Sequence, residues 1–452
     1  MGRTEGTPLT DGRFKRFTAR VATARPGSAG GRDGGPNAAP MPILIDPLFL
    51  DTSGANAFDA RKRFAAIPEF RIGGRYDLDE PESYRHGGVG GTTLESLGLP
   101  PAQIGYCTVG QPHRGANGEI DNAILICPYY TGDSTTMLDY WSAEGSLPAL
   151  SEAPCLGPGL LFDTDRSYCI LVDALGLWGC SKPSSSHPGQ PGTRALGLCF
   201  PQYSLEDCAQ LIVCLLREHL GIGKLKLVTG VSMGAALTYV LGVLHPHLSE
   251  ALLPIGGTAI QDRGMARWLF DLMTAAIQSD PVYRETGGSY YDRGRLEQPI
   301  LGNMFGWSLL RQSAYADELR LAQSPEQFML ESFDWELSPQ VLATRGAEPG
   351  WGQALYHAAL TDANDLIYRN RALARHNVLG ELHRVRARTL IVHVETDQWL
   401  HLHLARRAQE AIAGSRLLHF SHPLGHYAVF SAPHRYREEL SAWLGSGKPE
   451  TA

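Results

Sequence analysis

The sequence predicts an α/β fold built on a mostly parallel sheet with helices on both faces. Five short apolar runs indicate buried strands, because continuous rather than alternating apolarity suits strands that are covered on both sides. Helical patterns lie between these runs, and strands that alternate with helices favour parallel pairing. The five runs are Ala123–Cys127, Tyr168–Val172, Leu225–Thr229, Ala251–Ile255 and Thr389–Val394, and a weaker sixth run is Arg416–Phe420.

The segments around these strands fit the same fold. A helix is expected over Leu205–Leu220, because Ser204 followed by Asp207 makes a capping-box pattern in front of apolar residues at helical spacing. The region from Tyr76 to His113 has Gly-rich turns around alternating runs such as Gln103–Val109. Such runs are typical of antiparallel strands, and we expect them at the start of the sheet.

Between about residues 261 and 380 the strand signal disappears. Helical patterns rich in aromatic residues replace it, over Arg263–Gln278, Leu301–Tyr315, Pro325–Trp335 and Gln353–Asn377. A helical insert between two sheet strands is predicted to be a lid over the site, and ordinary packing helices are the alternative. The expected organisation is a disordered tail over 1–40, a core over 41–260, the lid over 261–380, the rest of the core over 381–446 and a second tail over 447–452.

Composition narrows the classes of function. The 452 residues are 43% hydrophobic and 19% charged, with a net charge of −7 and no sustained basic stripe, so nucleic-acid binding has no electrostatic support. No apolar run approaches the roughly 20 residues that a membrane helix needs. The eight cysteines form no Cys-x-x-Cys pair. With no signal peptide in view, reduced thiols in a cytoplasmic protein are expected, although an even count also permits disulfides.

The first 40 residues differ from the rest in being rich in arginine, glycine, serine and proline. Such a segment cannot bury enough apolar surface to fold, so a disordered tail is expected. An organelle transit segment, which tends to be rich in arginine and poor in acidic residues, is an alternative that three acidic residues weaken. Another alternative is that the sequence begins at an upstream start and that Met41 is the working start of translation.

Gly230-Val231-Ser232-Met233-Gly234 is the most informative stretch of the chain. It lies between an apolar strand-like run and a helix-like run, Ala235–Leu244. Gly-x-Ser-x-Gly between a strand and a helix indicates the nucleophile elbow of α/β-hydrolase folds, a sharp turn that lifts the serine oxygen out of the sheet. A side chain two residues either side of Ser232 would collide with neighbouring backbone, so glycine is required there. We therefore expect a catalytic serine at 232, with an ordinary Gly-rich turn as the alternative.

A serine hydroxyl is a poor nucleophile unless a neighbouring base accepts its proton and an acid orients that base. In α/β-hydrolase folds the acid and then the histidine follow the serine along the chain. Asp397, just past the last strong strand, is the expected acid, and Glu395 is the alternative. His426, near the chain end after the weaker last strand, is the expected base, and His422 and His419 are its competitors.

The tetrahedral intermediate of acyl transfer needs backbone N–H donors. Met233, directly after the serine, is expected to supply one. The loop after the first parallel strand, Pro128–Gly132, is expected to supply the other from Tyr130, and a simple strand-to-helix turn is the alternative there.

Three other patterns are weaker candidates for function. Gly87–Gly91 lacks the strand–helix frame of a phosphate loop, so we interpret it as a flexible turn. His401 and His403 have no companion metal ligands nearby, and surface histidines are expected. Cys180 lacks a paired base and is expected to be structural. Neither a metal nor a resident cofactor is predicted.

Further motifs accompany the elbow between about residues 123 and 430. They are Tyr-Thr-Gly at 130–132, Leu-Gly at 175–176, Lys182-Pro183-Ser184, Phe200-Pro201 with Asp207, Asp280-Pro281, Gly288-Ser289-Tyr290-Tyr291, Asp362-Ala363-Asn364, Thr396-Asp397 and Gly425-His426. Together they resemble the homoserine O-acetyltransferase-like branch of the α/β-hydrolase superfamily. The resemblance implies that fold with an inserted helical lid, Ser232, Asp397 and His426 as the triad, and Tyr130 and Met233 as the oxyanion hole.

The same resemblance implies the activity and the assembly. Members of that family move an acetyl group from acetyl-CoA to a hydroxyl through an acyl-serine, and they form homodimers through the lid. Two departures concern the substrate. Trp307 stands near the place of the arginine that holds the homoserine carboxylate, and Tyr427 replaces the aspartate that faces its ammonium. Losing both charged partners would leave an amino acid's charges unpaired, so a less polar acceptor is expected.

The expected function is therefore O-acyl transfer from acetyl-CoA or another acyl-CoA to a small hydroxylated acceptor other than homoserine. An esterase or amidase on the same triad is the first alternative, because sequence does not show how well the lid excludes water. Homoserine O-acetyltransferase itself is the second. A binding protein without catalysis is favoured only if the three triad residues lie too far apart for hydrogen bonds.

Overall fold

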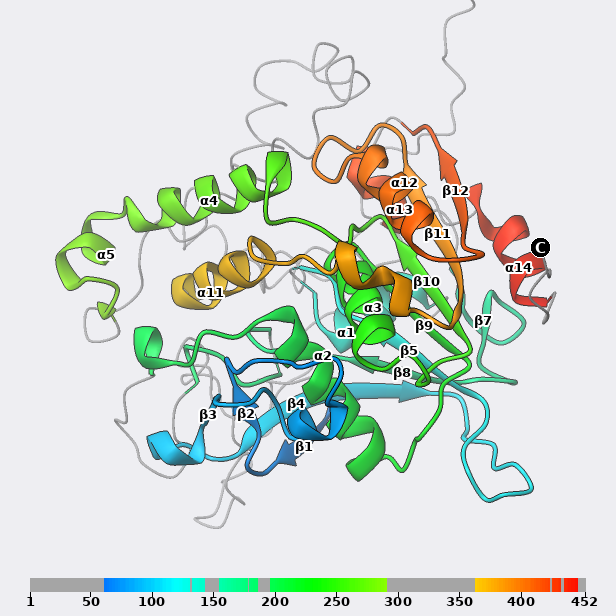
Figure 1. The fold of residues 1–452 in the computed structure, drawn as a ribbon, viewed down its shortest axis with the longest axis horizontal. Coiled ribbons are helices and arrows are strands. Elements are labelled where there is room, and N and C mark those ends of the chain that lie inside the picture. The colour runs from blue at the N-terminus through cyan, green and yellow to red at the C-terminus, as the bar shows by residue number, and fades with distance from the viewer. Residues whose placement is uncertain are drawn as a thin grey trace, which may run out of the picture.

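The computed structural model describes residues 61–130, 132–142, 154–177, 179–185, 196–290, 362–422, 425–431 and 435–445. Within these residues, eight strands form one sheet in the order β1-β4-β8-β5-β9-β10-β11-β12 (Figure 1). Strands β5 and β8 to β12 pair in parallel, whereas β4 is antiparallel to both β1 and β8. The strands are β1 (Arg63–Ile67), β4 (Ala102–Val109), β5 (Ala123–Cys127), β8 (Tyr168–Val172), β9 (Leu227–Val231), β10 (Ala251–Ile255), β11 (Arg388–Val394) and β12 (Arg416–Phe420).

The structure confirms the expected α/β architecture and all six apolar runs as strands. Three boundaries differ: β11 begins one residue earlier than its apolar run, and β9 both begins and ends two residues later than its run. The reason is pairing with its neighbours, because Gly230 lies opposite Cys127 of β5 and Val231 lies opposite Ile255 of β10. The sheet therefore continues to the residue before Ser232, and the elbow begins at the sheet edge.

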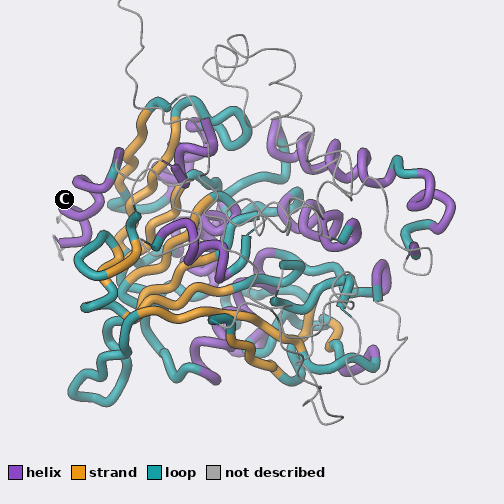
Figure 2. The backbone as a smooth tube through the Cα atoms, turned by 180° about the vertical axis from the view of Figure 1, so that it is seen from behind, coloured by secondary structure: helices purple, strands orange, loops and turns teal. Residues whose placement is uncertain are grey.

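Two apolar cores, one on each face of the sheet, hold the helices in place. Alternate residues of β5 point to opposite faces, so Leu125 packs into one core and Ile126 into the other. The first core includes α2 (Leu205–Cys214), α3 (Met233–Leu244) and α12 (Leu402–Ala411), and the second includes α1 (Ser134–Trp141), α13 (Ala428–Ser431) and α14 (Arg437–Gly445). Figure 2 shows the strands lying side by side among these helices.

The helix predicted from Ser204 begins as expected. The Ser204 side chain accepts from the Asp207 N–H, and the Asp207 carboxylate accepts from the Ser204 N–H. The α-helical part ends at Cys214, and a π-helical turn continues over Leu215–His219. The run predicted over Gln103–Val109 is part of β4. The Gly-rich region also contains β3 (Thr92–Thr93), which pairs antiparallel with β2 (Arg71–Ile72) just before that region.

The predicted lid region is described in part. It contains α4 (Gly264–Gln278), α5 (Pro281–Thr286) and α11 (Ala363–Leu373). Helices α4 and α11 pack against each other and lie side by side at one end of the molecule in both ribbon views. The helices expected over Leu301–Tyr315 and Pro325–Trp335 lie outside the described residues.

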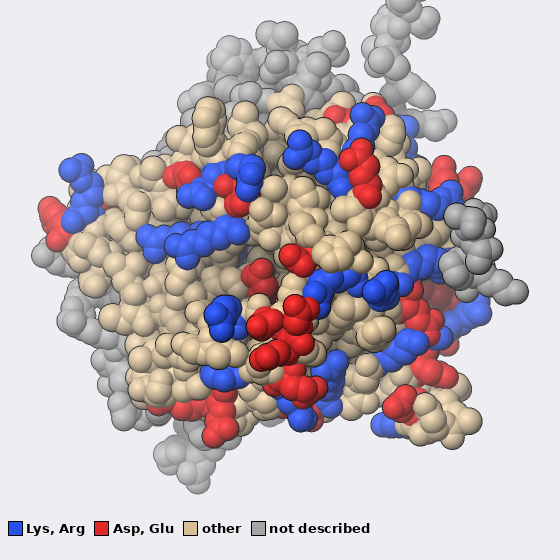
Figure 3. Space-filling view, viewed as in Figure 1, with Lys and Arg blue, Asp and Glu red and all other residues tan. Residues whose placement is uncertain are grey.

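The surface and the thiols complete the outline. On the face drawn in Figure 3, lysine and arginine side chains lie among aspartate and glutamate side chains, several of which group near the centre. None of the described helices is both long enough and apolar enough to span a membrane. All eight cysteines are free, and seven of them, Cys180 included, are buried.

Candidate active site

Ser232 sits on a strained turn between β9 and α3. Its φ of 57° and ψ of −112° are unusual for a residue with a side chain. The turn closes because its two glycines leave room: a Cβ on Gly230 would lie 2.6 Å from the backbone of Gly234, and one on Gly234 would lie 2.6 Å from the Cys127 carbonyl oxygen. The Ser232 N–H donates to the Ile255 carbonyl at 2.9 Å, which ties the turn to β10.

The structure brings Ser232, His426 and Asp397 into one hydrogen-bonded chain. His426 Nε2 lies 2.8 Å from Ser232 Oγ, and His426 Nδ1 lies 2.5 Å from Asp397 Oδ2. All three residues are buried, with exposed fractions of 7%, 4% and 3%. The residues come from three loops at the carboxyl ends of β9, β11 and β12, which meet at the same edge of the sheet.

Asp397 is itself fixed by the loop that carries it. Its Oδ1 accepts from the backbone N–H groups of Trp399 and Leu400, both at 2.9 Å, which leaves Oδ2 for His426. Burial alone would raise the pKa of this carboxyl, but the charge of His426 and the hydrogen bond to it leave the Asp397 pKa below its usual value. Asp397 is therefore an ionised acceptor that holds the His426 ring with Nε2 toward the serine.

The competing residues have other partners. Glu395 accepts from His419 at 2.5 Å and from the Ser421 hydroxyl, so the alternative acid and one alternative base bind each other at the exposed end of the sheet. The His422 carbonyl accepts from the Thr396 hydroxyl. His401 Nε2 contacts the Gln398 carbonyl, and among the described residues no three potential ligands are grouped to hold a metal ion.

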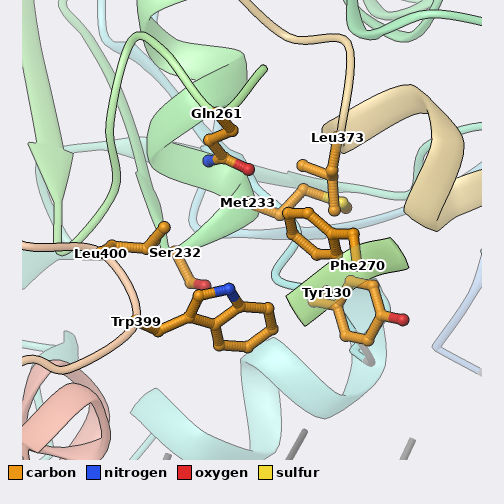
Figure 4. A pocket seen from close by; sticks show the side chains of 8 residues that line it. All are labelled: Tyr130, Ser232, Met233, Gln261, Phe270, Leu373, Trp399 and Leu400. Atoms are coloured by element: carbon orange, nitrogen blue, oxygen red, sulfur yellow. The ribbon is translucent and has the colours of Figure 1, made fainter. Parts of the chain in front are cut away.

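A small pocket opens on Ser232 (Figure 4). Its described lining is Tyr130, Ser232, Met233, Gln261, Phe270, Leu373, Trp399 and Leu400. Met233 is the first residue of α3, so its N–H has no acceptor within the helix and lies at the positive end of the helix dipole. The two residues predicted to form an oxyanion hole thus flank Ser232 in this pocket, and their role as donors stays a prediction.

Arg369 of α11 positions the Tyr130 loop, and sequence reasoning missed it. Its Nη1 donates to the Tyr130 carbonyl at 2.9 Å, its Nη2 donates to the Gly176 carbonyl, and its guanidinium lies 5.3 Å from the Tyr130 ring centroid. Arg369 is only 3% exposed. The neighbouring Asn370 accepts from the Tyr130 hydroxyl at 2.5 Å. The signal available in the sequence was an arginine in a helical pattern just after the motif at 362–364.

Other pocket residues were also missed. Trp399 follows Asp397 by two positions, and Gln261 follows the end of β10, so both lie where strand ends gather groups at a site. Phe270 of α4 and Leu373 of α11 bring the lid region to the pocket. Trp307 and the side chain of Tyr427, both predicted to contact substrate, lie outside the described part of the structure.

Comparison with known proteins agrees with this architecture. The chain is 28% identical over 349 residues to a probable acyltransferase of Methanothermobacter thermautotrophicus, covering 77% of this chain and 92% of that one. It is 28% identical over 329 residues to a homoserine O-acetyltransferase of Thermobifida fusca, covering 71% and 80%. The structure of an acetylester hydrolase from Corynebacterium glutamicum shares the fold with a TM-score of 0.61, at 19% identity and 85% and 96% coverage. No protein-family model matches the chain.

The fold and these relatives define an enzyme of the α/β-hydrolase class that catalyses acyl transfer or hydrolysis. Within that class, the chain is similar over most of its length to homoserine O-acetyltransferases such as the Thermobifida fusca enzyme.

Proposed function

We propose that this enzyme transfers an acetyl or short acyl group from acyl-CoA to a small hydroxylated acceptor other than homoserine, through an acyl-Ser232 intermediate. The observation that carries the proposal is the hydrogen-bonded chain from Ser232 Oγ through His426 to Asp397, with distances of 2.8 and 2.5 Å. A hydroxyl on a strained turn with a base at hydrogen-bond distance, itself oriented by a buried carboxylate, has the arrangement that nucleophilic acyl transfer requires.

Acylation begins when Ser232 Oγ attacks the thioester carbonyl and its proton passes to His426 Nε2. The tetrahedral oxyanion accepts from the backbone N–H groups of Met233 and Tyr130. Collapse of the intermediate breaks the carbon–sulfur bond, and the CoA thiolate takes the proton from His426. In deacylation the acceptor hydroxyl gives its proton to His426, attacks the ester, and releases Ser232 as the leaving group, which recovers that proton.

The lining of the pocket supports an uncharged acceptor. Within the described residues, no charged side chain lines it, and its apolar members include Met233, Phe270 and Leu373. The carboxylate and ammonium of an amino acid would lose water there without gaining an ion pair, and that loss is costly.

Intact-mass measurement of the protein after addition of acetyl-CoA tests the first half of the proposal. A mass increase of one acetyl group on the unmodified chain is expected, and none on Ser232→Ala. Ser96→Ala, which changes an exposed serine, is the matched control and should acylate normally. Acylation of Ser232→Ala to the same extent would refute the nucleophile.

Thiol release with and without alcohols tests the second half. Faster CoA release and an O-acyl product are expected when a neutral alcohol is present. Equal thiol release in both cases, with free acid as the only product, would mean that water is the acceptor and that the enzyme is a hydrolase on the same residues. A marked preference for homoserine over neutral alcohols would overturn the proposed acceptor class.

A further inference from the structure

Two buried polar atoms in the pocket beside Ser232 have no hydrogen-bond partner within the described residues. They are the side-chain oxygen Oε1 of Gln261 and the indole nitrogen Nε1 of Trp399. Gln261 is 1% exposed and Trp399 is 6% exposed. In Figure 4 both side chains reach into the pocket, and the nitrogen-bearing edge of the indole faces the Ser232 hydroxyl.

Such atoms are uncommon because a buried donor or acceptor without a partner destabilises the folded protein. Here the two have complementary character: Oε1 accepts a hydrogen bond, and Nε1–H donates one. Their presence in one pocket, beside the residue that would carry the acyl group, indicates that a bound ligand supplies both partners.

The backbone of both residues is held beside the site. The backbone N–H of Trp399 donates to Asp397 Oδ1 at 2.9 Å, and the centroid of the Trp399 ring lies 5.8 Å from that of the His426 ring. The Gln261 N–H donates to the His376 carbonyl at 2.8 Å. The same loop residues that fix the acid of the triad thus fix the unpartnered donor, so a ligand bound to it would be aligned with Ser232 and His426.

The rest of the lining restricts what that ligand is. The Tyr130 hydroxyl already donates to Asn370, and the remaining described side chains that line the pocket, Ser232 apart, are apolar. Because the described lining offers no charged partner, the ligand group that fits it best is uncharged and both donates and accepts. A hydroxyl does both with one oxygen, whereas a carboxylate can only accept and an ammonium can only donate.

We propose that Gln261 and Trp399 bind a second, unreacted hydroxyl of the acceptor, so that the preferred acceptor is a small neutral diol. This inference rests on the proposed acyl transfer to a hydroxylated acceptor and names its substrate class. The second hydroxyl donates to Gln261 Oε1 and accepts from Trp399 Nε1–H, while the first is presented to His426 and the acyl carbon. Both residues act on specificity, because neither is a reacting group.

The test compares propane-1,3-diol with propan-1-ol, which differ only in the second hydroxyl. The acyl enzyme is formed with acetyl-CoA, and kcat/KM for acyl transfer to each alcohol is measured. The unmodified enzyme should favour the diol by at least about tenfold, because propan-1-ol leaves both buried groups unpaired. Gln261→Met and Trp399→Phe keep the approximate shape, remove one partner each, and should each lower the ratio toward one. Gln202→Met, a glutamine outside the pocket, should leave it unchanged.

A binding measurement that needs no acylation separates this inference from the proposed function. Ligand-observed NMR with Ser232→Ala should show binding of propane-1,3-diol that exceeds that of propan-1-ol, and the added Gln261→Met change should reduce the excess. If the diol binds in this way but no acyl enzyme forms, the proposed reaction fails and the site stands. Equal ratios in the unmodified enzyme and both variants, with equal binding of the two alcohols, would overturn the inference.

Discussion

Replacing Asp397 with asparagine changes the candidate site by one atom and tests its logic closely. Two backbone N–H groups, those of Trp399 and Leu400, point at Asp397 Oδ1 from 2.9 Å, so the asparagine must keep its carbonyl oxygen there. Its NH2 group then faces His426 Nδ1 in place of Oδ2. A donor at that position obliges Nδ1 to accept, so the ring proton moves to Nε2 and the base can no longer take the serine proton.

The expected loss follows from the role of that tautomer. An equivalent change of tautomer in serine proteases lowers kcat by about 10⁴, which corresponds to about 5.5 kcal/mol of barrier. We expect Asp397→Asn to slow acylation of Ser232 by about 10³–10⁴. Stability should change little, because the two loop hydrogen bonds are kept.

The assay is the single-turnover rate of acylation by acetyl-CoA, followed by mass, with the thermal midpoint measured alongside. Because the pKa of Asp397 is below its usual value, the carboxylate stays ionised at neutral pH, and the unmodified enzyme should not lose activity through it above about pH 4. If Asp397→Asn keeps more than a tenth of the acylation rate, the orientation of His426 by this carboxylate is not what makes Ser232 reactive.

Three further outcomes are expected. Gly234→Ala should lower the free energy of unfolding by about 1–3 kcal/mol because its Cβ would lie 2.6 Å from a backbone carbonyl, whereas Gly223→Ala, with nothing within 4 Å, should leave the urea midpoint unchanged; equal midpoints would contradict the crowding argument. Burial lowers the pKa of His245 from 6.5 to about 3, so the folded state binds fewer protons than the unfolded state. The contribution of neutral His245 to the free energy of unfolding should be complete above pH 6.5 and should decline by up to about 1.4 kcal/mol per pH unit toward pH 3. His245→Gln should therefore reduce the dependence of the free energy of unfolding on pH, measured by urea titration between pH 7 and pH 4. An unaltered dependence would show that this ring is not responsible. Arg369→Met should lower the free energy of unfolding by about 1–3 kcal/mol and slow acylation, because it leaves two loop carbonyls unpaired. Arg375→Met, which changes an exposed arginine, should do neither. A loss of stability without a change in acylation rate would show that Arg369 does not act on the site.

Much of the core was predictable from local patterns. A parallel strand covered on both faces has to be apolar throughout, so runs such as Ala123–Cys127 identify themselves without knowledge of their neighbours. The elbow was equally visible, because the turn excludes side chains at Gly230 and Gly234 whatever the rest of the molecule does. The position of the serine was therefore predictable from five consecutive residues, because the turn leaves no room for a side chain at Gly230 or Gly234.

The choice of its partners was less local. Glu395 and Asp397 are only two residues apart, and both follow Ser232 and precede His426. Chain order alone therefore does not decide which of them is the acid. The structure separates them because residue 395 still belongs to the sheet edge, with its N–H donating to Phe420, whereas Asp397 has turned inward and lies buried. His419 and His426 divide in the same way: the first lies on β12, and the second lies beyond it, in reach of Ser232.

The sequence by itself determined the strands, the helices between them and the turn that carries Ser232, because each depends on residues close together in the chain. Only the tertiary structure decided which acid and which base meet that serine, that Arg369 holds the Tyr130 loop, and that Gln261 and Trp399 share one pocket. These groups lie tens to hundreds of residues apart, and contacts over such separations arise from the packing of the sheet and helices, which no short stretch of sequence encodes.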